Sequence, residues 1–126
     1  MKEFIYPLRV YVEDTDCGGI VFHANFLNYF ERARSEWAIA EGRGVEWQRE
    51  HGIGFVISSV KLDFLKPAFL HQKLEVVSRI KETRVASLVY DQYLRLADVK
   101  DTILCRAEIK TVCVDQNLRP RPLPKF

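Results

Sequence analysis

The residues best suited to chemistry lie in one short stretch, from Asp14 to Asn25. It contains two aspartates, a glycine pair, a histidine and an asparagine, and a long helical pattern follows it directly. The first turn of a helix presents unpaired backbone N–H groups and a partial positive charge, which can bind an anion or stabilise an oxyanion. A neighbouring carboxylate can act as a general base or as a nucleophile. This stretch therefore combines the two parts of an acyl-transfer site.

Each of these residues also has an ordinary structural role to weigh against chemistry. An aspartate before a glycine, such as Asp16, commonly caps a turn, and Asp14 is expected to orient the loop by accepting backbone N–H bonds. His23 could be a surface or capping histidine, and Asn25 is expected to be the N-cap of the helix. Cys17 is interpreted as a small loop residue rather than a nucleophile, because the helix end that could lower its pKa is several residues away.

The helix that must position this loop is predicted over residues 26–41. Apolar side chains recur there at helical spacing, which indicates one broad buried stripe: Phe26, Phe30, Ala33, Trp37 and Ala40. Gly42 is a suitable stop, because glycine readily adopts the left-handed conformation that often ends a helix. Residues 45–51 are expected to form one or two further helical turns before Gly52.

Most of the remaining chain alternates apolar and polar residues, which is typical of antiparallel strands. The first strand is predicted over residues 4–12. Beyond Gly54 the alternation predicts a strand with one shared face, formed by Val56, Ser58, Val60, Leu62 and Phe64. Three further strands are expected at about 70–80, 85–96 and 103–111, and an extended proline-rich tail from Asn117. This order predicts an α+β domain in which a five-stranded antiparallel sheet wraps around one long helix.

The composition is that of an ordinary globular domain. The chain has 126 residues, of which 48% are hydrophobic and 29% charged, and one domain over 1–126 is expected. A net charge of +2 without a basic stripe argues against nucleic acid as a partner. Three widely spaced cysteines, without a Cys-x-x-Cys pair, argue against a disulfide framework or a metal site. With no signal-like or membrane-spanning segment, a cytoplasmic location is expected.

Two blocks of sequence carry a resemblance to a known family. They are Asp-Thr-Asp-Cys-Gly-Gly at residues 14–19 and Tyr-Phe-Glu-Arg-Ala-Arg at residues 29–34. Together with the residues around them, they resemble the acyl-CoA thioesterases of the 4-hydroxybenzoyl-CoA thioesterase family, most of all its YbgC-like branch associated with the Tol–Pal system. The resemblance implies a hot-dog fold over nearly the whole chain and hydrolysis of acyl-CoA to the free acid and CoA. It also implies that no metal or cofactor is needed, and that homodimers or homotetramers form active sites at the subunit interface.

The resemblance also implies roles for particular residues. Asp16 matches the catalytic carboxylate, which acts as base or nucleophile. His23 matches a position whose backbone N–H polarises the thioester carbonyl and whose imidazole contributes in this branch. Gly18 and Gly19 would let the backbone approach the substrate closely, and Asn25 could hold a water or contact substrate.

The phosphates of CoA require basic partners, because Lys and Arg form charge-assisted hydrogen bonds to phosphate. Candidates on or just after the predicted strands are Lys61, Lys66, Arg79, Lys81 and Arg84. The chain departs from the branch at Val12, where a tyrosine is frequent. Tyr11 would not replace it, because adjacent side chains on a strand face opposite ways.

Two other functions compete with thioester hydrolysis. A hot-dog hydratase or dehydratase usually carries a His-Phe-Pro-Gly type signature, which this sequence lacks. A non-catalytic module that binds acyl-CoA or acyl carrier protein would not need Asp16, although Val12 leaves room for it. The sequence is compatible with several acyl groups, with CoA or acyl carrier protein as carrier, with Asp16 as nucleophile or base, and with a dimer or a tetramer.

Overall fold

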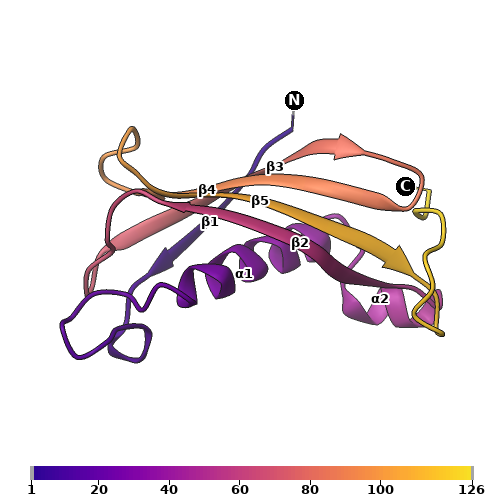
Figure 1. Cartoon of the computed structure of the whole chain (residues 1–126), viewed down its shortest axis with the longest axis horizontal. Coiled ribbons are helices and arrows are strands. Elements are labelled where there is room, and N and C mark those ends of the chain that lie inside the picture. Colours follow the sequence, from indigo (N-terminus) through magenta and orange to yellow (C-terminus); the bar gives the residue numbers. More distant parts are fainter. Residues whose placement is uncertain (1, 126) are drawn as a thin grey trace.

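The computed structural model describes residues 2–125, and these form a curved antiparallel sheet with two helices on one side (Figure 1). In chain order the elements are β1 (Phe4–Arg9), a 3-10 turn (Val12–Asp14), α1 (Asn25–Ala40), α2 (Val45–Glu50), β2 (Gly54–Phe64), β3 (Lys73–Thr83), β4 (Ser87–Leu96) and β5 (Ile103–Val114). Within the described part of the chain, no helix is both long enough and apolar enough to cross a membrane.

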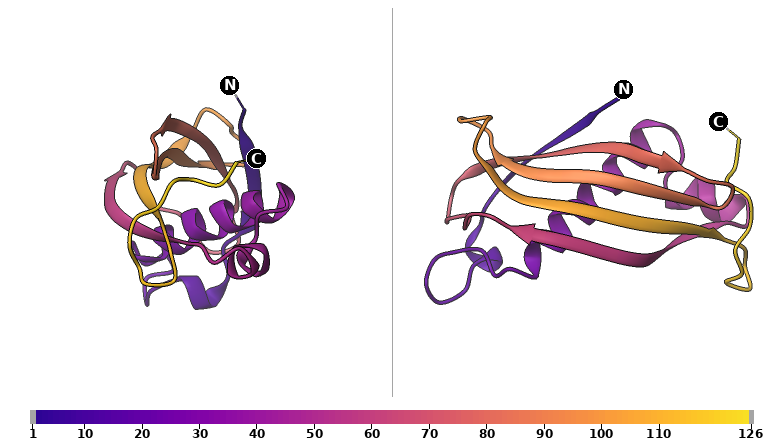
Figure 2. Two further views of the ribbon diagram at one scale, coloured as in Figure 1. Left: turned by 90° about the vertical axis from the view of Figure 1, so that its right-hand side faces the viewer. Right: turned by 45° about the horizontal axis from the view of Figure 1, so that its top comes forward.

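The sheet has the strand order β1-β3-β4-β5-β2, and every neighbouring pair is antiparallel. It curves around α1, which lies along its concave face (Figure 2). The predicted α+β architecture, with a five-stranded antiparallel sheet wrapped around one long helix, is therefore confirmed. β1 and β2 form the two edges of the sheet, so each leaves one side of its backbone without a strand partner among residues 2–125.

The apolar stripe of α1 forms the centre of the core. Its buried side chains include Phe26, Phe30 and Ala33, and they pack against Leu74 and Leu94 of the sheet. The stripe is wider than the predicted one, because Tyr29 and Arg34 are buried as well, whereas Ala40 is exposed.

A buried polar cluster pins α1 to the sheet. Gln92 is fully buried on β4 and donates to the Phe30 carbonyl (3.1 Å) and to the Ser78 hydroxyl (2.8 Å). Arg34 in turn donates to the Gln92 side-chain oxygen (2.9 Å). Because buried polar groups are stabilising only when paired, these bonds fix how far along the sheet α1 lies.

The end of α1 follows its sequence signal. Gly42 has φ +73°, and its N–H donates to the Ile39 carbonyl (3.0 Å), so the glycine ends the helix as predicted. The further helical turns predicted over residues 45–51 are present as α2. They end before Gly52, which also has a positive φ of +67°.

The predicted first strand is too long. β1 ends at Arg9, and the chain then folds into the 3-10 turn instead of continuing to residue 12. The cause is Asp14, whose carboxylate accepts the Tyr11 N–H (2.9 Å) and closes the turn. Tyr11 and Val12 are therefore both exposed, at 58% and 68%, rather than on opposite faces of a strand.

The predicted shared face of β2 is correct only in its second half: Val60, Leu62 and Phe64 share the face toward α1, whereas Val56 faces the other way. The pairing with β5 slips by one residue between Ile57 and Ser59, which is a β-bulge. A bulge reverses the alternation of side chains beyond it. Ile57 before the bulge and Val60 after it therefore face α1, opposite Thr111 and Ile109.

Candidate active site

The loop before α1 holds Asp16 in a tight, exposed turn. One carboxylate oxygen of Asp16 accepts the Gly18 N–H (2.8 Å), and the Asp16 N–H donates to the Ile20 carbonyl (2.8 Å). Gly19 has φ +80°, a conformation that side-chain-bearing residues rarely adopt. Asp16 thus caps a turn, as its structural role predicts, and its side chain remains accessible to solvent and substrate.

Asp14 joins this loop to the first turn of α1. It is 6% exposed, and its carbonyl accepts the Phe22 N–H (3.1 Å) and the Asn25 side-chain amide (2.9 Å). Burial raises the pKa of the Tyr29 hydroxyl far above its ordinary value, and the neighbouring Asp14 carboxylate raises it further. The predicted orienting role of Asp14 is confirmed, because its carboxylate also accepts the Tyr11 backbone N–H.

The helix start differs from the predicted one at Asn25. Ala24 precedes α1 with a helical backbone (φ −66°, ψ −22°), and no side chain caps the first turn. Asn25 is the first residue of α1 and uses its side chain elsewhere, donating to Asp14 and accepting from Asn28 (3.0 Å). The prediction of Asn25 as N-cap is therefore wrong. Its side chain instead connects the loop at Asp14 to the first turn of α1 through these two hydrogen bonds.

Two backbone donors at the helix mouth have no partner among residues 2–125. The Phe22 N–H donates to Asp14, whereas the Asn25 N–H donates back to the Phe22 carbonyl (2.8 Å). Within residues 2–125, the N–H groups of His23 and Ala24 between them have no backbone acceptor. Such groups at a helix N-terminus are suited to bind an oxygen that carries negative charge.

Aromatic side chains surround this helix mouth. The His23 ring lies 4.7 Å from the Phe22 ring and 5.9 Å from the Phe64 ring, measured between centroids. Phe64 also contacts Phe26, at 5.8 Å. These aromatic rings, from the end of β2 and the start of α1, form an apolar rim around the unpaired N–H groups. The rim is open to solvent, because His23 is exposed.

The basic candidates lie in different places, and two of them are in ion pairs on the sheet: Arg79 with Asp91, and Lys81 with Glu108. Lys66 follows β2 near the loop end of the molecule, where its N–H donates to the Leu104 carbonyl (3.0 Å). Lys61 on β2 lies opposite Glu108 of β5 in the strand register, so its side chain is on the face of the sheet away from α1.

Arg84 lies at the other end of the sheet, where β2 begins. Its N–H donates to the Ser87 carbonyl (2.9 Å), and its side chain is paired with Glu82. One chain alone therefore brings together Asp16, the two glycines, His23 and Asn25, with Lys66 on the same end. It does not bring Arg84 to them.

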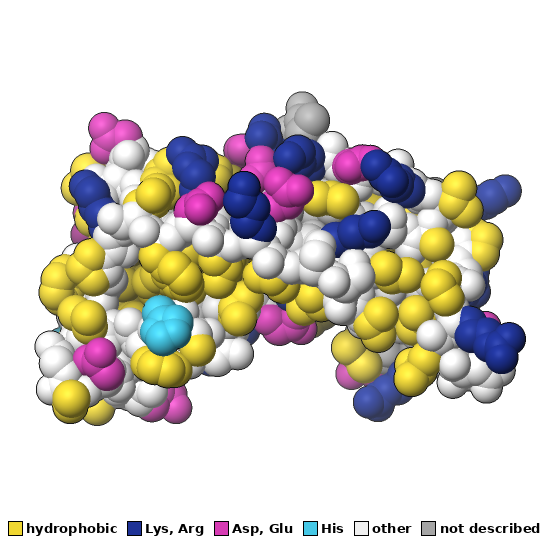
Figure 3. Space-filling model, viewed as in Figure 1, with side chains coloured by type: hydrophobic (Ala, Val, Ile, Leu, Met, Phe, Trp, Pro, Cys, Tyr) yellow, Lys and Arg dark blue, Asp and Glu magenta, His cyan; other side chains and the backbone are white. Residues whose placement is uncertain are grey.

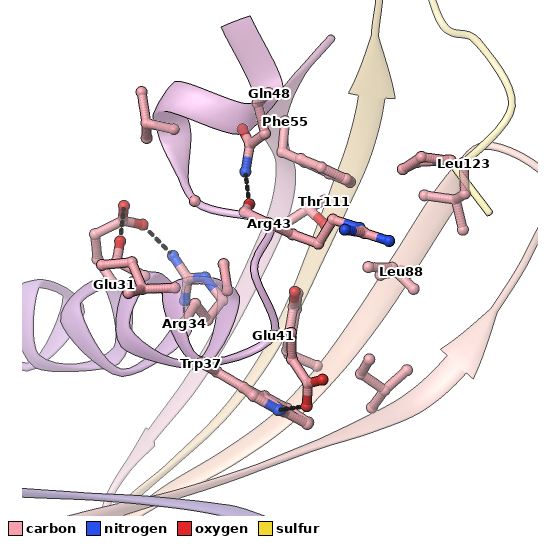
Figure 4. A pocket seen from close by; sticks show the side chains of 18 of the residues that line it. Glu31, Arg34, Trp37, Glu41, Arg43, Gln48, Phe55, Leu88, Thr111 and Leu123 are labelled. Atoms are coloured by element: carbon pink, nitrogen blue, oxygen red, sulfur yellow. Dashed lines mark hydrogen bonds and ion pairs between the residues drawn. The ribbon is translucent and has the colours of Figure 1, made fainter. Parts of the chain in front are cut away.

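The sequence did not reveal a second feature, a groove of about 870 Å³ between the C-terminal half of α1, α2 and the sheet. Side chains such as Trp37, Phe55 and Leu88 line it (Figure 4). Figure 3 shows hydrophobic side chains along the same side of the molecule and a hollow between the two ends. The bulge in β2 turns Phe55 and Ile57 into this groove, and alternation alone gives no signal for such a bulge.

Among residues 2–125, no three His, Cys, Asp or Glu side chains are grouped closely enough to hold a metal ion.

The family of the chain follows from comparison with known proteins. Residues 10–126 match the family model of the thioesterase-like superfamily, and the chain therefore belongs to this superfamily. The predicted class of thioester hydrolase and the predicted relationship to the YbgC-like branch are confirmed by this match and by the relatives that follow.

The similar proteins cover nearly the whole chain. An acyl-CoA thioesterase YbgC from Helicobacter pylori is 50% identical over 94% of this chain and 92% of its own length. An acyl-CoA thioester hydrolase YbgC from Escherichia coli is 37% identical over 97% and 90%. Among solved structures, a probable thioesterase from Bartonella henselae has a TM-score of 0.90 and 29% identity, covering 98% of this chain and 100% of that one. The hot-dog fold is thereby confirmed.

Proposed function

We propose that the protein hydrolyses acyl-CoA thioesters to the free acid and CoA at the Asp16 loop. The observation that carries this proposal is the pair of unpartnered N–H groups, on His23 and Ala24, beside an exposed carboxylate. Its YbgC relatives, named as acyl-CoA thioesterases, support CoA as the carrier. Acyl carrier protein is the alternative carrier, and thiol release from acyl-CoA and from the matching acyl carrier protein thioester, measured side by side, distinguishes the two.

The helix mouth stabilises the charge that develops during the reaction. The thioester oxygen accepts the N–H bonds of His23 and Ala24 as the carbonyl carbon becomes tetrahedral. The positive end of the α1 dipole adds to this stabilisation, because the thioester oxygen lies at the first turn, where the effect of the dipole is strongest. The aromatic rim of Phe22 and Phe64 excludes part of the water, which strengthens these interactions.

Asp16 supplies the second half of the chemistry. It either attacks the carbonyl carbon, giving an anhydride that water then cleaves, or removes a proton from the attacking water. In both routes the C–S bond breaks and the electron pair leaves on sulfur. CoA thiolate is a good leaving group, so no strong general acid is required. The bond from Gly18 to Asp16 holds the carboxylate in place for either role.

A second copy of the chain is proposed to complete the site. β2 is an edge strand with exposed apolar side chains, including Val56, Ile57, Val60 and Phe64. Natural proteins cover such edges, and a two-fold axis that pairs two β2 strands covers the β2 edge of both copies at once. Antiparallel pairing places the Phe64 end of one strand against the Gly54 end of the other. Arg84 of the second copy then approaches the Asp16 loop as a partner for CoA phosphate, together with Lys66.

The proposed setting is the cytoplasm. Cys17, Cys105 and Cys113 are all free thiols, which suits a reducing compartment.

Thiol release from a panel of short, medium, long and aromatic acyl-CoAs tests the proposal, with Asp16→Asn as the variant. Asparagine keeps an oxygen to accept the Gly18 N–H, so the turn is preserved while the charge is lost. We expect the rate of thiol release to fall by about 10²–10⁴-fold if Asp16 is a general base, and by more if it is the nucleophile. Asp115→Asn is the matched control, because Asp115 also caps a turn, by accepting the Asn117 N–H (2.8 Å). A wild-type protein that binds acyl-CoA without releasing thiol would indicate a binding module instead.

A further inference from the structure

The hydroxyl of Tyr29 is a buried polar group that the chemistry described above does not use. Tyr29 is 0% exposed and lies on α1, one helical turn beyond Asn25. Among residues 2–125, its hydroxyl oxygen makes no hydrogen bond of standard geometry. A buried tyrosine hydroxyl usually has a partner, because phenylalanine would fill the same space without the cost of desolvating an oxygen. A hydroxyl at this position therefore indicates a polar interaction with a neighbouring group.

The Asp14 carboxylate is the neighbour that can supply this interaction. Burial raises the pKa of the Tyr29 hydroxyl, and the negative charge of Asp14 and a hydrogen bond to its carboxylate raise that pKa further. The two groups are therefore close, although their contact falls outside standard hydrogen-bond geometry. One carboxylate oxygen of Asp14 accepts the Tyr11 N–H (2.9 Å), so the other oxygen can accept the hydroxyl hydrogen.

The Tyr29 ring is held by its neighbours on α1 and in the core. It lies 6.2 Å from the Phe26 ring, measured between centroids, and the Arg32 guanidinium lies 5.7 Å from its own centroid. It also belongs to the core cluster that joins α1 to the sheet. Because these contacts fix the ring, a bond from its hydroxyl fixes the position of Asp14 relative to α1.

Asp14 in turn lies on both sides of the two unpaired N–H groups at the helix mouth. Its carbonyl accepts the Phe22 N–H (3.1 Å), directly before them, and the Asn25 side-chain amide (2.9 Å), directly after them. A shift of Asp14 would therefore move the N–H groups of His23 and Ala24 relative to a bound thioester. Small misplacements of this kind slow a reaction strongly, because the groups no longer meet in the productive geometry.

We propose that Tyr29 is a positioning residue for thioester hydrolysis: its hydroxyl donates a hydrogen bond to the Asp14 carboxylate and thereby fixes the N–H groups of the helix mouth. The inference rests on the proposed function. Tyr29 does not touch the substrate, because its side chain is fully buried. Its effect falls on the transition state, since the N–H groups bind the thioester oxygen most strongly as negative charge develops. Loss of the hydroxyl should therefore lower kcat and leave KM unchanged.

Tyr29→Phe removes the hydroxyl and keeps the ring. We expect kcat for thiol release from acyl-CoA to fall by about tenfold, with KM within about twofold of the wild-type value. This loss is smaller than the roughly 10²–10³-fold caused by removing an oxyanion donor, because both N–H groups are still present.

Tyr93→Phe is the matched control. Tyr93 lies on β4 between the buried residues Gln92 and Leu94, so its side chain is on the face of the sheet away from α1. The guanidinium groups of Arg95 and Arg106 lie over its ring there, each 5.9 Å from the centroid. This variant loses a tyrosine hydroxyl without touching the loop, and it should keep the wild-type kcat and KM.

A double-mutant cycle with His23→Pro separates positioning from a general structural effect. The proline variant lacks one of the two N–H groups that Tyr29 is proposed to position. Adding Tyr29→Phe to it should therefore lower kcat by no more than about threefold. A change that only reduced the fraction of folded protein would lower kcat equally in both backgrounds. Urea unfolding of each variant measures that fraction independently.

Asp14→Asn provides a second route that does not depend on the folding of Tyr29→Phe. Its amide oxygen can still accept the Tyr11 N–H, and its backbone carbonyl is unchanged, but the carboxylate that receives the Tyr29 hydroxyl is lost. It should also lower kcat by about tenfold with an unchanged KM, and by no more than about threefold when added to His23→Pro.

The outcomes separate this inference from the proposed function. Wild-type protein that releases no thiol from acyl-CoA overturns both. A wild-type kcat in Tyr29→Phe, or a raised KM with unchanged kcat, overturns the positioning role and leaves the hydrolase in place. The same conclusion follows if Tyr29→Phe, or Asp14→Asn where the first variant does not fold, costs as much in His23→Pro as it does alone.

Discussion

Replacing His23 by proline removes a backbone N–H that no other group in the described chain uses. The Asn25 N–H bonds to the Phe22 carbonyl, so His23 is the second residue of a four-residue turn. Proline is favoured at that position, because its fixed φ suits it and the N–H there is not needed. The His23 carbonyl, which accepts the Phe26 N–H (3.2 Å), is retained. His23→Pro should therefore fold.

The matched control is His23→Ala. Both variants lose the imidazole and its contacts with Phe22 and Phe64, but only the proline variant loses the N–H. The ratio of their rates consequently isolates the backbone donor. Removing one oxyanion donor costs about 10²–10³-fold in kcat, or roughly 2.7–4 kcal/mol. We expect His23→Pro to be slower than His23→Ala by that factor.

Two measurements decide this prediction. Thiol release under saturating acyl-CoA gives kcat, and denaturant unfolding gives the free energy of unfolding of both variants. The unfolding free energies should agree within about 1 kcal/mol, since proline at a compatible site changes stability by that amount or less. Equal kcat values in two equally stable variants would refute the assignment of the His23 N–H as an oxyanion donor.

Two further predictions concern thiols and pH. Burial raises the pKa of the Cys105 thiol to about 12. At pH 8 the exposed Cys17 should therefore react with an aromatic disulfide reagent far faster than Cys105. Equal reaction rates would contradict the packing of β5. Burial alone would raise the pKa of Glu75, but hydrogen bonds from Lys100 and Arg95 outweigh it and hold the pKa below its usual range. Glu75 therefore stabilises the fold above the unfolded pKa of about 4.3 and loses this contribution as the pH falls. Glu75→Gln should cost about 1–2 kcal/mol at pH 7 and progressively less below pH of about 4, which urea unfolding at both pH values would measure.

The parts of the fold that sequence predicted are those fixed by repeated local signals. The apolar stripe from Phe26 to Trp37 and the positive-φ stop at Gly42 determine α1 almost without reference to the rest of the chain. Apolar residues also alternate along β3 to β5, because one face of each strand packs on α1, with interruptions where the register shifts after Ile80 and Leu94.

The parts that were missed depend on single hydrogen bonds or on strand pairing, which leave no repeated pattern in the sequence. The strand before the loop ends early because the Asp14 carboxylate binds the Tyr11 N–H. Asn25 does not cap the helix because the Asp14 carbonyl takes its amide. The slip near Ser58 depends on pairing with β5 and turns Ile57 toward α1, which is why the groove could not be foreseen.

The candidate site was more predictable than its surroundings. The residues of the Asp16 loop are adjacent in sequence, so they lie together in any fold that places this loop before the helix. Lys61 and Arg84 were harder to place, since strand register decides on which face and at which end of the sheet each lies.

The most direct test of thioester activation at the α1 mouth is the ¹³C chemical shift of a labelled thioester carbonyl in acyl-CoA bound to Asp16→Asn. Because hydrolysis is slow in this variant, the bound thioester can be observed before it is cleaved. We expect a downfield shift relative to free acyl-CoA, caused by the His23 and Ala24 N–H groups, and a smaller shift in the double variant Asp16→Asn with His23→Pro. A bound carbonyl with the same shift as free acyl-CoA, or an equal shift in both variants, would contradict the proposed role of the helix N-terminus.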